Sequence, residues 1–85
     1  MKETVKLFLE VIENEMLDSG ETRQYVTFEY IASFLDEDET IEEFYRTLTE
    51  LCSDYGFVWK KTTNKNHMWN VNEPKHFDII VCKVD

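Results

Sequence analysis

The stretch from Thr40 to Trp59 limits the possible folds of this chain more than any other, because it contains a long amphipathic helix and the start of a strand. Thr40 and Glu43 have the spacing of a capping box, so the helix is predicted to begin at Ile41. Gly56 stands where many helices end with a left-handed residue, and an aromatic, β-branched run follows it at once. A helix is thus predicted to give way directly to a strand.

The apolar residues of this helix recur at steps of three and four, the pattern of a helical face buried in a core. The predicted buried face comprises Ile41, Phe44, Tyr45, Leu48, Leu51, Cys52 and Tyr55. The opposite, mostly acidic face comprises Glu42, Glu43, Arg46, Thr47, Thr49, Glu50 and Asp54. We therefore expect a core helix with a solvated acidic back.

Two further helices are predicted upstream. The first covers residues 2–18, buries one apolar stripe and stops at Gly20. Its stripe comprises Val5, Phe8, Leu9, Ile12 and Met16, broadened by Leu7, Val11 and Leu17. Residues 23–26 are predicted to be extended, and Thr27 is a suitable N-cap for a helix over residues 28–35.

The apolar coverage of the first helix is wider than one surface helix needs. Either the other helices and the sheet cover both edges, or part of the helix meets a partner or a second copy of the chain. The second alternative predicts a homodimer that substitutions such as Phe8→Asp or Met16→Asp would disrupt.

Strands are predicted after the third helix. Residues 57–63 and 67–71 flank a short turn and form a hairpin. Residues 77–84 form an almost continuous apolar run, which favours a strand that is covered on both faces or central in the sheet. The chain of 85 residues is therefore predicted to be one α+β domain, with three helices followed by a small antiparallel β-sheet.

The formal net charge of −9 is unevenly placed. Residues 1–59 hold four basic and fifteen acidic side chains, whereas residues 60–85 hold five basic and three acidic ones. The acidic helical part repels phosphate and attracts basic partners, so nucleic-acid binding through the helices is disfavoured. Simple solubility is the alternative explanation of the same charge.

Signatures of catalysis are missing from the sequence. It has no glycine-rich phosphate loop, no HExxH and no nucleophile with an obvious helper, so we expect neither an enzyme nor a bound cofactor. The acidic run over residues 36–39 lacks the glycine of a calcium loop, and no metal site is predicted. Two cysteines without ligand spacing indicate reduced core residues of a cytoplasmic protein, and no membrane partner is expected.

The order of the elements resembles the winged helix-turn-helix superfamily over residues 4–72. FEYIASFL matches the first helix of the pair, DEDET the turn, IEEFYRTLTELCSDYGF the recognition helix and VWKKTTNKNHMWNV the wing, with FDIIVCKV as an addition. The resemblance implies a recognition helix in the major groove and a wing on the DNA backbone. Here the first turn of that helix carries carboxylates, which repel the phosphates of DNA.

Size and charge also look like those of small acidic proteins with which phages and mobile elements inhibit host nucleases, polymerases or defence complexes, some by mimicking DNA. This likeness favours an interaction module that binds a basic surface on a nucleic-acid-handling protein. The predicted partner-binding residues are Glu29, Asp36, Glu37, Asp38, Glu39, Glu42, Glu43, Glu50 and Asp54.

The alternative is a winged-helix transcriptional regulator that contacts DNA through its wing. Lysine, asparagine and histidine side chains in the hairpin are suitable for phosphate contacts. The predicted DNA-contacting residues are Lys60, Lys61, Asn64, Lys65 and His67.

Overall fold

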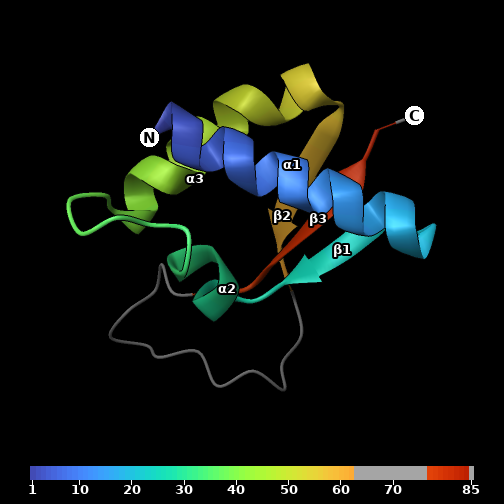
Figure 1. The fold of residues 1–85 in the computed structure, drawn as a ribbon, viewed down its shortest axis with the longest axis horizontal. Coiled ribbons are helices and arrows are strands. Elements are labelled where there is room, and N and C mark those ends of the chain that lie inside the picture. Colours follow the sequence, from blue (N-terminus) through green and yellow to red (C-terminus); the bar gives the residue numbers. More distant parts are fainter. Residues whose placement is uncertain (63–76, 85) are drawn as a thin grey trace.

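The structure, a computed structural model, describes residues 1–62 and 77–84 and shows the predicted α+β fold (Figure 1). Three helices and a three-stranded antiparallel sheet account for most of these residues. In chain order the elements are α1 (Lys2–Ser19), β1 (Arg23–Val26), α2 (Phe28–Ala32), α3 (Ile41–Cys52), the 3-10 helix η1 (Ser53–Tyr55), β2 (Phe57–Lys61) and β3 (Ile79–Lys83).

The strand order is β1-β3-β2, and both pairings are antiparallel. β3 is therefore the central strand, which is one of the two positions that its apolar run predicts. In the winged-helix resemblance this last strand is an addition to the pattern, but it is the strand with which β2 pairs. The predicted hairpin strand at residues 67–71 lies outside the described residues.

Local signals fix most of the element ends. The Thr40 hydroxyl accepts the Glu43 N–H at 3.2 Å, which confirms the predicted start of α3. Gly20 ends α1 with φ 74°, and Gly56 follows η1 with φ 75°, so both glycines adopt the left-handed conformation that their positions predict.

The second helix is shorter than predicted. Thr27 caps it by accepting the Tyr30 N–H at 3.2 Å, but regular α-helix ends at Ala32. Beyond that residue the backbone tightens into turns, and Phe34 N–H donates to the Ile31 carbonyl at 3.0 Å. This tightening accompanies the packing of the Phe34 ring edge-on against Phe8 of α1, at 5.4 Å between centroids.

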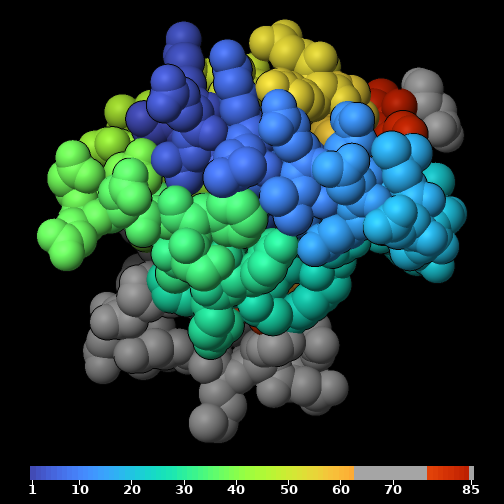
Figure 2. All heavy atoms as spheres, in the orientation of Figure 1, coloured from blue at the N-terminus to red at the C-terminus, as the bar shows by residue number. Residues whose placement is uncertain are grey.

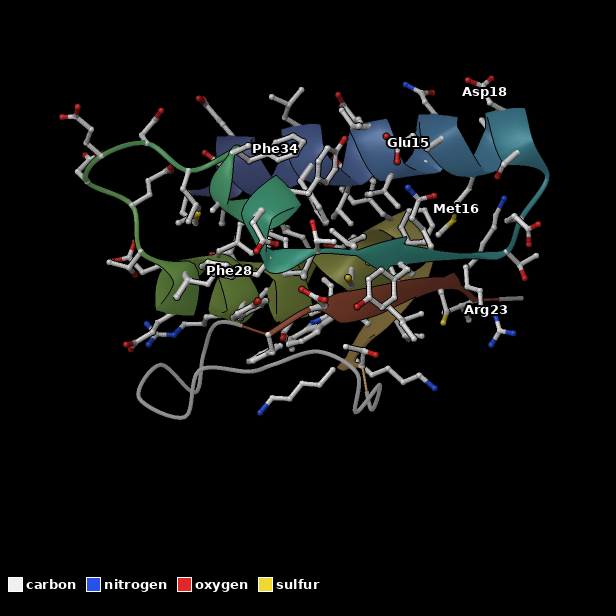
Figure 3. The ribbon with its side chains drawn as sticks, turned by 90° about the horizontal axis from the view of Figure 1, so that it is seen from below. Glu15, Met16, Asp18, Arg23, Phe28 and Phe34 are labelled. Atoms are coloured by element: carbon white, nitrogen blue, oxygen red, sulfur yellow. The ribbon has the colours of Figure 1, made fainter. Side chains whose placement is uncertain are left out.

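The core lies between α1, α3 and one face of the sheet, because α1 crosses in front of the sheet and packs against both α3 and β1 (Figure 1). Met16 points from α1 toward the sheet and Asp18 points away from it (Figure 3). All five residues of the predicted α1 stripe are buried: Val5, Phe8, Leu9, Ile12 and Met16.

Two predictions about individual helix positions need correction. Thr47, assigned to the polar face of α3, is only 9% exposed, because it lies one turn before Leu51 at the border of the apolar stripe. Phe8 and Met16 belong to the core and cannot contact a second copy. The uncovered apolar residues of α1 are instead Leu7 and Leu17, which are 55% and 65% exposed.

Aromatic stacking holds β2 against α3. The Tyr45 ring stacks on Trp59 at 5.1 Å and on Phe77 at 4.8 Å, and Lys61 Nζ lies 4.5 Å from the centroid of the Phe77 ring. These contacts join α3, β2 and the residues before β3. None of the helices that the structure describes is long and apolar enough to cross a membrane.

Candidate functional site

The turn before α3 is attached to the start of α1 by one carboxylate. The Thr4 hydroxyl donates to both oxygens of Glu39, at 2.9 and 3.0 Å, and the Asp36 N–H donates to Glu39 Oε1 at 2.9 Å. The amino group of Met1 forms an ion pair with Glu39 Oε2 at 3.6 Å. These contacts give the acidic turn a fixed position beside α1.

The same contacts stabilise the ionised form of Glu39. The N–H of Asp36 first, and the Thr4 hydroxyl second, lower the pKa of the Glu39 carboxyl below its ordinary value of 4.5. Glu39 is one of the predicted partner-binding residues, but both of its oxygens already have partners inside the chain. These contacts give Glu39 a structural role.

A hollow of about 570 Å³ lies between this turn and the first turn of α1. In Figure 2 the start of α1 and the connection between α2 and α3 lie side by side on the face in view. We call the site the acidic hollow and define it by four carboxylates on its wall: Glu3, Asp36, Asp38 and Glu43. The remaining wall residues are Met1, Lys2, Thr4 and Glu39.

In the part of the chain that the structure describes, the four carboxylates of the acidic hollow have no cation paired with them. Within residues 1–62 and 77–84, none of the four forms an ion pair, and Lys2 is the lysine on the wall. Four anionic groups therefore line one concave surface. Such a surface favours a cationic partner group, because the cation would meet several carboxylates at once.

The structure divides the nine predicted partner-binding residues. Asp36, Asp38 and Glu43 line the hollow, while Glu37 and Glu42 are exposed and adjoin these residues in the sequence. The other exposed members lie elsewhere: Glu29 on α2, Glu50 on α3 and Asp54 on η1. Glu3 joins the hollow from α1, and no sequence signal relates it to residues more than thirty positions away.

Lys60 and Lys61, the predicted wing lysines that the structure describes, lie on different faces of the sheet. Lys60 pairs with Ile80 and Lys61 with Ile79, so their side chains project from opposite faces of the sheet. The Lys61 ammonium lies over the Phe77 ring, whereas Lys60 is exposed on the other face. The remaining predicted wing contacts, Asn64, Lys65 and His67, lie outside the described residues.

A buried carboxylate that is not among the predicted site residues lies directly before β3. Asp78 is 6% exposed, accepts the Phe28 N–H at 2.8 Å and accepts the Tyr25 hydroxyl. The loss of water around the Tyr25 hydroxyl, and then the hydrogen bond to Asp78, raise the pKa of Tyr25 to about 12. Asp78 thus joins β3 to β1 and to the first turn of α2.

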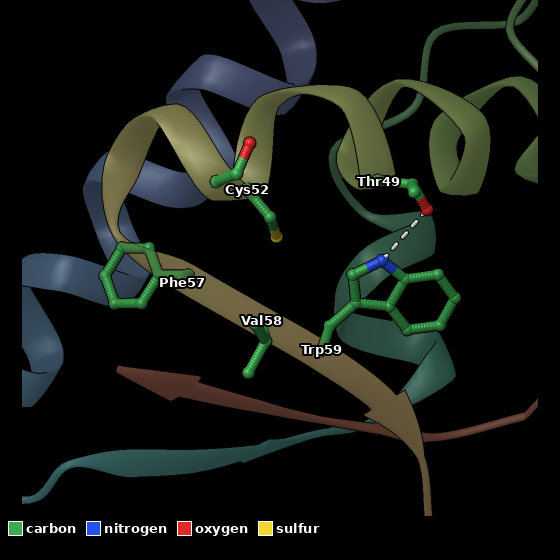
Figure 4. Close-up of a pocket in the computed structure, with 6 residues that line it drawn as sticks. Thr49, Cys52, Phe57, Val58 and Trp59 are labelled. Atoms are coloured by element: carbon green, nitrogen blue, oxygen red, sulfur yellow. Dashed lines mark hydrogen bonds between the residues drawn. The ribbon is translucent and has the colours of Figure 1, made fainter. Parts of the chain in front are cut away.

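A second concave site lies between α3 and β2 (Figure 4). This pocket has a volume of about 300 Å³ and is lined by Thr49, Cys52, Ser53, Phe57, Val58 and Trp59. The Trp59 indole N–H donates to the Thr49 hydroxyl at 3.1 Å, and that hydroxyl donates to the Tyr45 carbonyl at 2.9 Å. These two bonds fix the indole as one wall of the pocket.

The Cys52 thiol is held in its protonated form by burial. Burial raises the pKa of the Cys52 thiol to about 11, so the thiolate is almost unpopulated at neutral pH. Among residues 1–62 and 77–84, no three His, Cys, Asp or Glu side chains are arranged to hold a metal ion.

Comparison of the chain with protein-family models, with curated proteins and with solved structures gives no match. The winged helix-turn-helix resemblance therefore stays a prediction from the order of the elements. Arguments about function rest on the geometry and charge of the chain itself.

Proposed function

We propose that this chain is a small, non-enzymatic protein-binding module whose acidic hollow engages a basic surface on a nucleic-acid-handling protein. The observation that carries the proposal is the convergence of Glu3, Asp36, Asp38 and Glu43 on one concave surface. An inhibitor of the kind carried by phages and mobile elements is the biological role that fits such a module.

The physical basis is charge complementarity. Surfaces that hold nucleic acids present clustered lysine and arginine side chains to phosphates, and clustered carboxylates carry the same sign of charge as those phosphates. A chain with a net charge of −9 is drawn to such surfaces over several ångströms before contact. Binding of this kind weakens as salt rises, because the Debye length shortens.

The proposal is tested by a pull-down from a bacterial lysate with three forms of the tagged chain. The first is the natural chain, and the second carries Asp36→Asn, Asp38→Asn and Glu43→Gln. The third is a matched control that loses the same three charges from exposed positions of α1, through Glu10→Gln, Glu13→Gln and Asp18→Asn.

The expected result is a protein that survives nuclease treatment, elutes with rising salt, and is lost with the hollow variant but retained with the control. Equal loss from both variants would show that total charge alone causes retention. Retention that requires intact nucleic acid would contradict the proposal.

The order of the elements favours a second candidate, a DNA-binding winged-helix regulator. We infer that such binding would depend on the wing, because the exposed side of α3 carries Glu42, Glu43 and Glu50 around a single Arg46. The candidate predicts a mobility shift of DNA at low salt that disappears when Lys60→Ala and Lys61→Ala are combined. The opposite orientation of these two lysines makes it the weaker candidate.

A further inference from the structure

The side of α1 that faces away from the core carries a row of exposed residues. Leu7, Glu10, Asn14 and Leu17 follow one another at steps of three, four and three, the spacing at which two helices pack along each other. All four are exposed, and the two leucines are 55% and 65% exposed. We call these four residues the outer row. In Figure 2 α1 runs across the face in view with its atoms at the surface, where a second helix can reach it.

Leu7 and Leu17 give the outer row two apolar contacts. They are ten residues apart, which is about 15 Å along a helix axis. A small hollow of about 180 Å³ adjoins the second leucine at the end of α1. The hollow is lined by Met16, Leu17, Gly20, Glu21, Thr22 and Lys83. A helix that lies along the outer row would therefore place one apolar side chain against Leu7 and another against Leu17, beside the hollow.

Carboxylates surround these apolar contacts. Residues 7–22 contain no lysine or arginine, and the exposed carboxylates of this stretch are Glu10, Glu13, Asp18 and Glu21. Within residues 1–62 and 77–84 none of the four forms an ion pair. Asp18 points away from the sheet (Figure 3), whereas Glu15 is used inside the chain and accepts the Tyr30 hydroxyl at 3.1 Å. The surface around the outer row is thus both apolar and acidic.

The cationic side chains at the ends of this surface do not balance its carboxylates. Lys6 directly precedes the outer row, and Lys83 lines the hollow beside Leu17. Arg23 points away from α1, on the other side of the sheet (Figure 3). Two lysines against four carboxylates leave a net charge of −2 among the described residues of this surface. Charge complementarity therefore favours a cationic occupant.

We infer that α1 binds a basic amphipathic helix of another protein along the outer row. Two apolar side chains of that helix meet Leu7 and Leu17, and lysine or arginine side chains between and beside them meet Glu10 and Glu13. A second copy of the chain is a less favourable occupant, because it would bring another net charge of −9 to the same surface. The outer row shares no residue with the acidic hollow, so binding at one surface does not require the other.

The test uses the full-length chain, labelled for NMR, and two capped, alanine-rich helical peptides. Both peptides carry two leucines ten positions apart. Lysines lie between and beside the leucines in the first peptide, and glutamates replace them in the control. We expect the lysine peptide to shift the amide signals of the outer row, and the glutamate peptide to leave them unchanged.

Apolar contact is tested by truncation of the two leucines. Leu7→Ala combined with Leu17→Ala should weaken binding of the lysine peptide about tenfold, because the variant loses most of the apolar area that the peptide covers. Val58→Ala combined with Val84→Ala is the matched control, since these residues are 53% and 50% exposed and lie outside α1. The control should bind the lysine peptide as the natural chain does.

The two variants of the pull-down separate the outer row from the acidic hollow. The variant with Glu10→Gln, Glu13→Gln and Asp18→Asn should bind the lysine peptide about fivefold more weakly while it still retains the lysate protein. The hollow variant should bind the peptide like the natural chain and lose the lysate protein. Failure of the proposed function would thus leave the peptide result unchanged.

Several results would overturn binding along α1. Shifts confined to residues of the acidic hollow would overturn it while supporting the proposed function. Equal binding of both peptides, or equal binding by the leucine and valine variants, would also contradict it. Nuclear Overhauser contacts in the free chain between Leu7 or Leu17 and another segment, or a second copy, would show that the outer row is already covered.

Discussion

Glu39 Oε2 lies 2.9 Å from Thr4 Oγ1, so one carboxylate joins the start of α1 to the turn before α3, thirty-five positions along the chain. Together with the ion pair between the Met1 amino group and Glu39, this contact holds the start of α1 beside the acidic turn, on the other side of the acidic hollow. The residue therefore supports the proposed binding surface without belonging to it.

Replacement of Glu39 should destabilise the fold in a pH-dependent way. The lowered pKa means that ionised Glu39 stabilises the folded state above its ordinary pKa of 4.5, and that this contribution is lost as pH falls through the lowered value. Thermal unfolding should show a lower Tm for Glu39→Gln than for the natural chain at pH 7. The difference should shrink in strongly acidic buffer.

The control for this experiment is Glu37→Gln, which removes a charge from an exposed neighbour on the same turn. Its Tm should stay close to that of the natural chain at both pH values. A Tm difference for Glu39→Gln that does not change with pH would contradict the assigned role of the carboxylate.

Asp78→Asn should destabilise the chain by about 1–3 kcal/mol, because a buried acceptor of the Phe28 N–H and the Tyr25 hydroxyl is altered. Urea unfolding followed by circular dichroism measures the change. Asp54→Asn, at an exposed position, should change the free energy of unfolding by less than about 0.5 kcal/mol. Equal stability of the Asp78→Asn and Asp54→Asn variants would show that Asp78 does not hold β3 to α2.

Tyr25 should make the chain sensitive to alkali. Its pKa is raised from 10.0 to about 12, so the folded state retains a proton that the unfolded chain loses. The corresponding stability is complete below pH 10 and is lost as pH rises toward 12. Tyr25→Phe should therefore lose less stability between these two pH values than the natural chain does, as measured by urea unfolding at each pH. A parallel decline of the two proteins would be inconsistent with this assignment.

Replacement of two neighbouring α1 side chains by alanine should change the free energy of unfolding by very different amounts. Phe8 is fully buried, so Phe8→Ala should cost about 3–5 kcal/mol of unfolding free energy. Leu7 is 55% exposed, and Leu7→Ala should cost less than about 0.5 kcal/mol. Chemical denaturation of both variants measures this difference in the free energy of unfolding.

If the exposed Leu7 and Leu17 form a homodimer contact, the combined substitutions Leu7→Asp and Leu17→Asp should dissociate the dimer while the monomer stays folded. Sedimentation measures the oligomeric state of the natural chain and of this variant.

Gly56→Ala should destabilise the junction between η1 and β2 by about 1 kcal/mol. Its φ of 75° is unfavourable for a residue with a Cβ, although the space around it is open, with no atom within 4 Å of a built Cβ. Gly56→Asn should cost less, because asparagine tolerates this conformation better. Thermal unfolding of the two variants distinguishes a conformational cause from a steric one, which would affect asparagine more.

Local signals in the sequence were sufficient for most of the helical part. Thr40 and Thr27 cap α3 and α2, Gly20 and Gly56 follow helical segments, and the apolar periodicity of α1 identifies its buried face. Each of these features depends on residues within four positions of one another. Such interactions are encoded by hydrogen-bond geometry and helical period, which a single sequence displays directly.

Contacts between distant segments cannot be predicted from the sequence in the same way. Three features bring together residues that are separated by many positions. They are the place of β3 between β1 and β2, the position of Glu3 and Asp36 on the wall of one hollow, and the burial of Asp78. No short-range pattern specifies which distant group a carboxylate will meet. The opposite orientations of Lys60 and Lys61 also depend on their register with β3.

The α+β class, the helix caps and the acidic character of the helical part can be predicted from the sequence, because they follow from local spacing and composition. Which carboxylates surround a hollow, which one is used internally, and where β3 lies in the sheet follow from the tertiary structure alone. The physical reason is that burial, ion pairing and strand register are set by contacts between segments, and those contacts form only when the whole core is assembled.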